Sequence, residues 1–231
     1  MKYCIVQLDY YKDRNTKKYS IFKNVFQPSV ERYAKKYKID YKIITYQADY
    51  FPHHAEKVKI FKDIVLNYTE YNNVLFLDLD VFVTSCSPNI FDSIECQHIA
   101  GCIASYERLL FGINLTQHKL QNSNNNLSAL GSRTVRPNSG VVLFNLTKIP
   151  KQAFHANEED ILEDEMFLAY KFAYRNLCYQ IIPYQWNHRD LFSLDNAYFI
   201  HALSNLFDDN GMDSKRNIHL EDVVNRIHSV Y

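Results

Sequence analysis

The sequence predicts an α/β fold in which a mixed, mostly parallel central sheet is flanked by helices in a single domain. Apolar runs that are typical of strands alternate with longer helical segments in the first part of the chain, which is the pattern of βαβ units. The 231 residues are 47% hydrophobic and 23% charged, which are globular values that provide for a sizeable core. No internal repeat or low-complexity linker divides the chain, so we expect one domain.

The first part of the chain alternates strand and helix. Short apolar runs and apolar side chains at helical spacing predict strands over residues 2–8, 41–46 and 74–77, and helices over residues 19–37 and 54–68. Pro28 is expected to kink or restart the first helix, because proline has no backbone N–H.

The second part is less regular. The same patterns predict strands over residues 99–104, 141–144, 179–183 and 197–200, and helices over residues 158–175 and 218–230. The polar segment 112–132 is rich in Asn and Ser, so we expect a long loop or lid there.

Composition excludes several classes of function. A net charge of zero argues against nucleic acid as the main partner. The 5 glycines are dispersed, so a glycine-rich phosphate loop is excluded, and the 5 cysteines show no C-x-x-C spacing for zinc. No signal peptide and no apolar stretch of transmembrane length is recognised, so we expect a cytoplasmic protein, with peripheral attachment to a membrane surface left open.

Two aspartates follow the apolar run Val74-Leu75-Phe76-Leu77. Residues at i and i+2 of a strand point to the same face, so the carboxylates of Asp78 and Asp80 would repel each other there. A divalent cation relieves that repulsion, and oxygen ligands suit Mg²⁺ or Mn²⁺. The alternative is that Asp80 caps a turn while Asp78 faces solvent.

Two enzyme families use aspartates in this pattern. In the haloacid-dehalogenase phosphohydrolases the first aspartate is a nucleophile on the first strand, and a small residue and then Thr or Val follow the motif. Here about 70 residues precede Asp78 and Phe82 follows Val81, so that resemblance is poor, although the acidic segment 208–213 keeps it open.

The second family resembles more of the chain. From Asp78-Leu79-Asp80 onward the sequence resembles the GT-A glycosyltransferases, which use nucleotide-sugar donors, and it is most similar to their retaining family-8 type. Further stretches resemble that family in the same order: Glu56-Lys57-Val58-Lys59-Ile60, Arg136-Pro137-Asn138-Ser139-Gly140-Val141-Val142-Leu143-Phe144-Asn145, Asp164-Glu165-Met166-Phe167-Leu168, and Phe199-Ile200-His201 followed by Lys215. The resemblance spans roughly residues 2–220.

The resemblance implies a set of roles around a metal ion. Mn²⁺ or Mg²⁺ would be bound by Asp78, Asp80 and His201, with Asp78 also facing the donor. Asp164 would contact the hydroxyls of the donor sugar, and Glu165 would lie beneath its anomeric carbon. Glu165 stands where the family has Gln, and Met166 replaces its second Asp, so the choice between retention and inversion stays open. An acidic first turn that favours the helix dipole is the structural alternative.

The resemblance also implies residues that bind the donor, each with a structural alternative. Asp9 and Tyr10 would hold the nucleotide, and Lys59 and Lys215 would contribute charge. The segment Asn138-Ser139-Gly140 would face the sugar, or would be an ordinary turn before a strand. Trp186 and Asn187 would contact the sugar, although Trp186 fits a core position equally well.

These inferences predict an enzyme that transfers a hexose from a UDP-sugar to a glycan, lipid or protein acceptor. Metal dependence through the aspartate pair and a retaining outcome are expected. By the same resemblance residues 1–83 form the nucleotide-binding half, and residues 84–231 bind the donor sugar and the acceptor. The alternatives are the phosphohydrolase and a non-catalytic module that binds a nucleotide-sugar.

Overall fold

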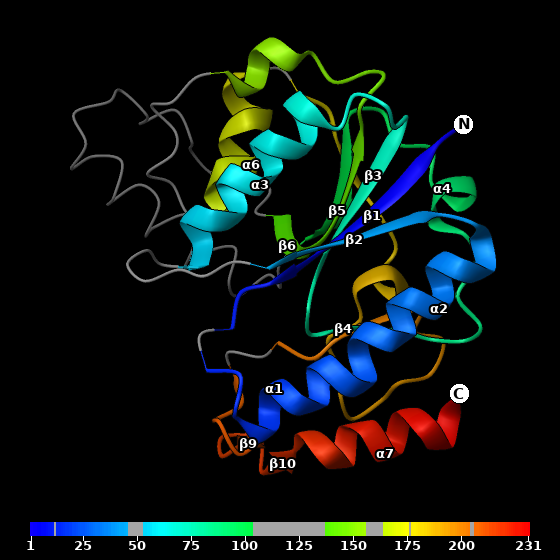
Figure 1. The fold of residues 1–231 in the computed structure, drawn as a ribbon, viewed down its shortest axis with the longest axis vertical. Helices are drawn as coiled ribbons and strands as arrows, with labels where there is room; N and C mark the ends of the chain where they lie inside the picture. The colour runs from blue at the N-terminus through cyan, green and yellow to red at the C-terminus, as the bar shows by residue number, and fades with distance from the viewer. Residues whose placement is uncertain (12, 46–52, 104–136, 156–163, 176, 204–205) are drawn as a thin grey trace, which may run out of the picture.

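A twisted six-stranded sheet lies at the centre of the molecule, with strand order β2-β1-β3-β6-β5-β7 (Figure 1). The computed structural model describes residues 1–11, 13–45, 53–103, 137–155, 164–175, 177–203 and 206–231. The predicted loop 112–132 and the first residues of the predicted helix 158–175 lie outside the described residues.

The three N-terminal strands are parallel, as the alternation of strand and helix predicted. β1 (Tyr3–Asp9) pairs with both β2 (Asp40–Thr45) and β3 (Asn73–Asp78). The carboxyl ends of parallel strands meet at one edge of a sheet, where open α/β folds bind their ligands. Asp9 and Asp78 therefore lie at the same edge.

The helix predicted over residues 19–37 is observed as three consecutive segments. α1 (Lys17–Ile21) runs into the π-helical turn η1 (Phe22–Phe26), and α2 (Gln27–Tyr37) follows. Pro28 stands in the first turn of α2, directly after the π-helical turn, and the chain stays helical through Phe26. The predicted irregularity at this proline is therefore a change from π-helical to α-helical geometry.

The antiparallel strand β6 (Pro137–Asn145) makes the sheet mixed. It lies between β3 and β5 (Ile99–Ile103), and β7 (Tyr179–Ile181) pairs parallel with β5 at the far edge. β6 begins four residues before the predicted strand 141–144. Asn138, Ser139 and Gly140 therefore belong to the strand itself, and a turn before the strand is the wrong interpretation.

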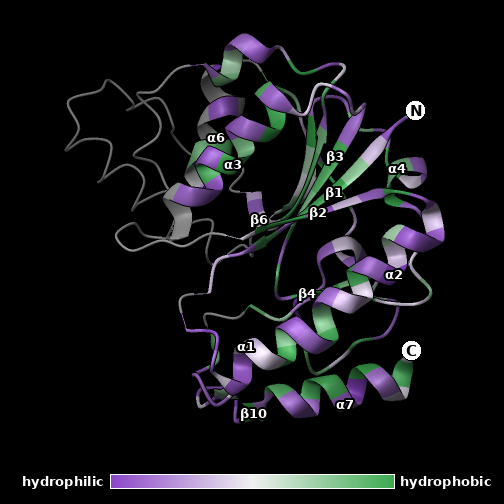
Figure 2. Ribbon diagram, in the orientation of Figure 1, coloured by the Kyte–Doolittle hydropathy of each residue, from purple (hydrophilic) through white to green (hydrophobic). Residues whose placement is uncertain are grey.

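Helices cover both faces of the sheet (Figure 1). α3 (His53–Asn67) and α6 (Asp164–Tyr174) lie on one face, and α2 lies on the other. Along β3, Val74 and Phe76 pack in the cluster beneath α3, while Leu75 and Leu77 pack in the cluster beneath α2. This alternation makes the central strands apolar on both faces, and Figure 2 shows that these strands are largely hydrophobic. Asp78 continues the even-numbered series toward α3.

The remaining elements lie outside the central sheet, and most of them belong to the C-terminal part of the chain. They are β4 (Val81–Val83), α4 (Ile90–Ser93), η2 (Lys151–Phe154), η3 (Tyr184–Asn187), β8 (Phe199–His201), β9 (Met212–Asp213), β10 (Ile218–His219) and α7 (Leu220–Val230). α7 begins two residues later than predicted because β10 pairs with β9. Among the described helices, none combines the length and the apolar character needed to cross a bilayer.

Candidate functional site

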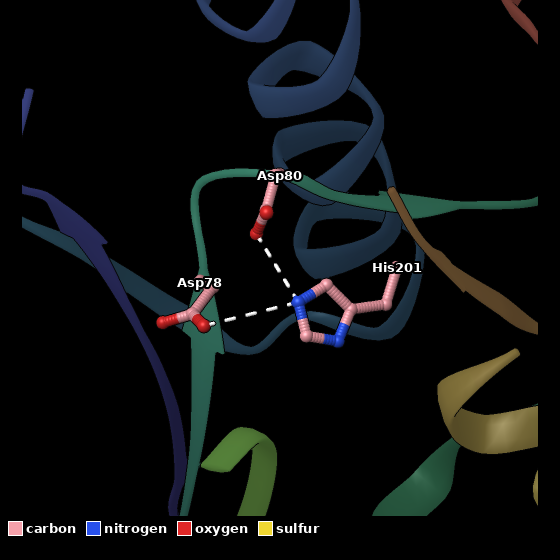
Figure 3. A group of neighbouring side chains, drawn as sticks. All are labelled: Asp78, Asp80 and His201. Atoms are coloured by element: carbon pink, nitrogen blue, oxygen red, sulfur yellow. Dashed lines mark ion pairs between the residues drawn. The ribbon is translucent and has the colours of Figure 1, made fainter. Parts of the chain in front are cut away.

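The turn after β3 and the pairing of β4 with β8 bring Asp78, Asp80 and His201 together (Figure 3). Asp78 is the last residue of β3, and Asp80 lies in the turn that leads into β4. β8 runs antiparallel to β4 with His201 opposite Val81, and the N–H of Ala202 donates to the carbonyl of Asp80 at 2.9 Å. The turn, rather than strand alternation, makes the two carboxylates converge, which corrects the sequence argument.

The three side chains form a compact, buried group. His201 Nε2 lies 3.4 Å from Asp80 Oδ1 and 3.9 Å from Asp78 Oδ2. One ligand atom from each residue lies within 4.8 Å of the others. Asp78 Oδ1 is buried without a hydrogen-bond partner, so it is available to a further ligand. Two carboxylates and an imidazole fit Mn²⁺ or Mg²⁺, and the predicted proximity of these residues is confirmed.

Lys57 from α3 lies beside this group, and the sequence analysis did not assign it a role. Its Nζ is 2.7 Å from Asp78 Oδ2, 3.2 Å from Asp164 Oδ2 and 3.3 Å from Ser139 Oγ. Ser139 Oγ donates to Asp164 Oδ2 at 2.6 Å. These four buried side chains bind the start of α6, β6 and the end of β3 to α3.

The electrostatics of this cluster are set by burial and by mutual charge. Burial and the neighbouring Asp80 together raise the pKa of Asp78 to about 6, against the opposing effect of Lys57. Burial lowers the pKa of Lys57, but the carboxylates of Asp78 and Asp164 outweigh burial and raise it above its ordinary value. Lys57 is therefore a permanent cation at this edge of the sheet.

Lys59, which the sequence analysis selected, points elsewhere. Its side chain is 54% exposed and its Nζ lies 3.5 Å from Glu56 Oε1. Spacing could have separated the two lysines, because Lys57 precedes the buried Phe61 by four residues and so shares its helix face. The basic residue of α3 that contacts Asp78 is therefore Lys57, and a role of Lys59 in binding the donor stays a prediction.

Asp164 and Glu165, the two residues predicted to act on the donor sugar, lie in the first turn of α6. Asp164 is buried and is held by Lys57 and Ser139. Glu165 is half-buried, and Asn138 Nδ2 donates to its Oε1 at 3.4 Å. Both carboxylates therefore face β6 beside the metal-binding candidates.

Asn187 is fully buried and contacts His201 directly. His201 Nδ1 lies 3.0 Å from Asn187 Oδ1, and Asn187 Nδ2 donates to Asn138 Oδ1 at 2.7 Å. The side-chain amides of Asn187 and Asn138 both form hydrogen bonds with other protein groups. We therefore place Asn187 behind the imidazole rather than against a donor sugar.

Gly140 lets the imidazole of His201 lie against β6. A Cβ at this position would lie 2.1 Å from Cε1 and 2.6 Å from Nδ1 of His201. Gly140→Ala should displace the ring and weaken Mn²⁺ binding by roughly 10–100-fold, the range found when the supports of metal ligands are lost. Calorimetric titration with Mn²⁺ measures this loss.

Gly211→Ala provides the control for Gly140→Ala. Gly211 has a φ of +81°, and an added Cβ would meet only Leu220 Cβ at 3.4 Å. We expect this variant to lose about 1–2 kcal/mol of stability through backbone strain. Its Mn²⁺ affinity should match the wild type, and equal affinities for all three proteins would contradict the role of Gly140.

Trp186 lies in the core, which corrects its assignment to the donor. Its side chain is 2% exposed and its ring packs against Tyr198 and Phe199 with centroid distances of 4.8 and 5.2 Å. No face of the ring is open to a sugar.

Trp186→Phe tests this core position. We expect it to lower the free energy of unfolding by about 1–3 kcal/mol, as core truncations do, and to leave the affinity for UDP unchanged. Chemical denaturation followed by circular dichroism measures the first, and calorimetry with UDP measures the second. Weaker UDP binding with unchanged stability would restore Trp186 to the site.

The other predicted donor residues are placed as follows. Asp9 ends β1 and is 1% exposed; Tyr19 Oη donates to its Oδ2 at 3.0 Å, while its Oδ1 is buried without a partner. Tyr10 follows Asp9 and stacks on Tyr11 with a centroid distance of 5.1 Å. Lys215 is exposed between β9 and β10, and its backbone N–H donates to Asp213 Oδ1.

Comparison with known proteins identifies the fold. No protein-family model and no curated protein matches the sequence. A solved structure of a glycosyltransferase involved in glycosylation of the major capsid of PBCV-1 matches with a TM-score of 0.57 and 14% identity, over 98% of this chain and all of that one. The galactosyltransferase LgtC, with donor and acceptor sugar analogues, matches with a TM-score of 0.55 and 15% identity, over 98% and 96%. This chain has the GT-A fold.

A third similar structure belongs to a longer protein. The bifunctional glycosyltransferase WbbM matches with a TM-score of 0.61 and 14% identity, over 99% of this chain and 50% of WbbM. The fold predicted from the sequence, an α/β domain with a mixed central sheet of GT-A type, is thereby confirmed.

Proposed function

We propose that this protein is a metal-dependent glycosyltransferase that moves a hexose from a UDP-sugar to a glycan, lipid or protein acceptor. The observation that carries the proposal is the convergence of Asp78, Asp80 and His201 at the carboxyl edge of the parallel strands in a GT-A fold. Ligands of open α/β folds bind at this edge. The glycosyltransferases with similar structures support the class of reaction.

Asp78, Asp80 and His201 would bind Mn²⁺ or Mg²⁺. As a Lewis acid, that ion would neutralise the charge that develops on the departing nucleoside diphosphate. Asp9 lies at the same edge, and its buried Oδ1 is free to accept from the N–H of a nucleobase. Tyr10 offers an aromatic ring beside Asp9. The exposed Lys215 would contact the phosphates, a role that follows from the family resemblance alone.

Lys57 and Asp164 would orient the donor sugar. Ser139 and Lys57 hold the Asp164 carboxylate in one position, and we propose that this preorganised carboxylate contacts a hydroxyl of the donor sugar. Glu165 follows on the same helix turn. We propose that its carboxylate stabilises the developing oxocarbenium character at the anomeric carbon, with retention of configuration.

Release of UDP tests the proposal. The protein should release UDP from UDP-glucose or UDP-galactose in the presence of Mn²⁺, and EDTA should stop the release. Calorimetry should show UDP binding that requires Mn²⁺. Metal-dependent UDP binding without turnover on a broad acceptor panel would indicate a binding module, and release of inorganic phosphate from a phosphomonoester would indicate a phosphohydrolase.

A further inference from the structure

We infer that Asn138 and Asn187 form a directional chain of amides that fixes the tautomer of His201, so that Nε2 carries the lone pair facing Asp78 and Asp80. Asn187 is then a positioning residue for the proposed metal site, and Asn138 acts on His201 without touching it. The inference deepens the proposed function, on which the metal-binding part of it rests.

The direction of the chain is set by a backbone group. Gly140 N–H lies 3.1 Å from Asn138 Oδ1, and a backbone N–H can only donate. The side-chain atom of Asn138 that faces it must therefore be the oxygen. That leaves Asn138 Nδ2 to donate to Glu165 Oε1 on the other side.

The next link follows from the first. Asn187 contacts Asn138 Oδ1 at 2.7 Å, and because this oxygen can only accept, Asn187 must present Nδ2. Asn187 Oδ1 then faces His201 Nδ1 at 3.0 Å. An amide oxygen can only accept, so Nδ1 must carry a proton. In the neutral ring Nε2 is consequently the unprotonated nitrogen.

Burial makes the alternative arrangement costly. Asn187 is 0% exposed, and Asn138 and His201 are each 4% exposed. Turning either amide would set two donors or two acceptors against each other, and each unsatisfied buried group costs about 1–3 kcal/mol. Nε2 is the nitrogen that lies 3.4 Å from Asp80 Oδ1, so the chain presents the lone pair to the aspartates.

Nitrogen NMR of the imidazole tests the tautomer without any metal. In the chelator-treated wild type at pH 8, we expect Nδ1 of His201 to carry a proton and to have a pyrrole-type shift, the signal being assigned with His201→Gln. Asn187→Leu removes the acceptor and should give a mixture of tautomers. Asn138→Leu should do the same from a distance, since it frees the Asn187 amide to turn.

Asn138→Asp made together with Glu165→Gln, and Asn145→Leu, are the matched controls. A carboxylate at position 138 still accepts from Gly140 N–H and Asn187 Nδ2, and Glu165→Gln removes the carboxylate that its other oxygen would otherwise face, so the wild-type tautomer should persist. Asn145 is also a buried amide of β6, and it bonds to Cys96 and Thr147 away from the site. Its loss should not change the His201 spectrum.

Calorimetry with Mn²⁺ supplies the second readout. Asn187→Leu should bind Mn²⁺ roughly 10–100-fold more weakly than the wild type, and Asn145→Leu equally well. The opposite tautomer in the wild type, or an unchanged His201 spectrum in both Asn187→Leu and Asn138→Leu, would overturn the inference. Failure of the wild type to bind Mn²⁺ while the spectra behave as expected would overturn the metal site but not the amide chain.

Discussion

Asp80→Asn is expected to lower the rate of UDP release by roughly 10³-fold, because loss of the metal removes several kcal/mol of transition-state stabilisation and each 1.4 kcal/mol is a factor of ten. Asparagine keeps the size of the side chain but is neutral, and it presents at most one weaker oxygen ligand. Asp80 is a better target than Asp78, because Asp78 also pairs with Lys57 at 2.7 Å. Loss of the Asp78 carboxylate would leave the buried Lys57 with one counter-charge fewer.

Asp40→Asn is the control for Asp80→Asn. Asp40 begins β2, so it lies at the end of the parallel strands opposite to their carboxyl edge. There its carboxylate accepts from Tyr71 Oη. Mn²⁺ titration and UDP release should be normal in this variant, whereas Asp80→Asn should lose both. Full activity of Asp80→Asn at saturating Mn²⁺ would remove the aspartate pair from the proposed mechanism.

Local pattern was sufficient to predict the parallel half of the sheet. β1, β2 and β3 are short apolar runs separated by segments with helical spacing, and such units have few alternative arrangements. The end of β3 at Asp78 was predicted because charge follows an uninterrupted apolar run. The proximity of that aspartate to His201 required the family resemblance, because 122 residues of sequence separate Asp78 from His201 and no local pattern indicates their contact.

The site predictions that differ from the structure concern which way a side chain points, rather than which segment of the chain reaches the site. Both lysines fall in the predicted helix 54–68 and the resemblance selected Lys59, but which lysine faces Asp78 depends on the face that α3 buries. The prediction that Trp186 meets a sugar failed for a similar reason, because a tryptophan suits a core and a binding site equally well. Asn187 lies at the site but bonds to His201, a contact that only the three-dimensional arrangement of η3 and β8 reveals.

Lys57→Met should lower the free energy of unfolding by about 3–5 kcal/mol, the cost of leaving buried charge without its partner. Lys57 Nζ contacts both Asp78 and Asp164, and all three side chains are buried. Methionine fills a similar volume but provides no charge and no donor. The two carboxylates would then face each other across an apolar side chain, and protonation or separation of α6 from β3 would have to relieve the repulsion.

Lys17→Met isolates this effect, because it removes the same side chain from an exposed ion pair. Lys17 and Glu221 are 50% and 55% exposed, so this replacement should cost less than about 1 kcal/mol. Urea denaturation of both variants in EDTA compares the two lysines without any contribution from bound metal. Equal losses of stability would show that Lys57 is not the counter-charge of the aspartates. A large loss for Lys57→Met alone would show that a cation built into α3 holds Asp78 and Asp164 together before any metal or donor arrives.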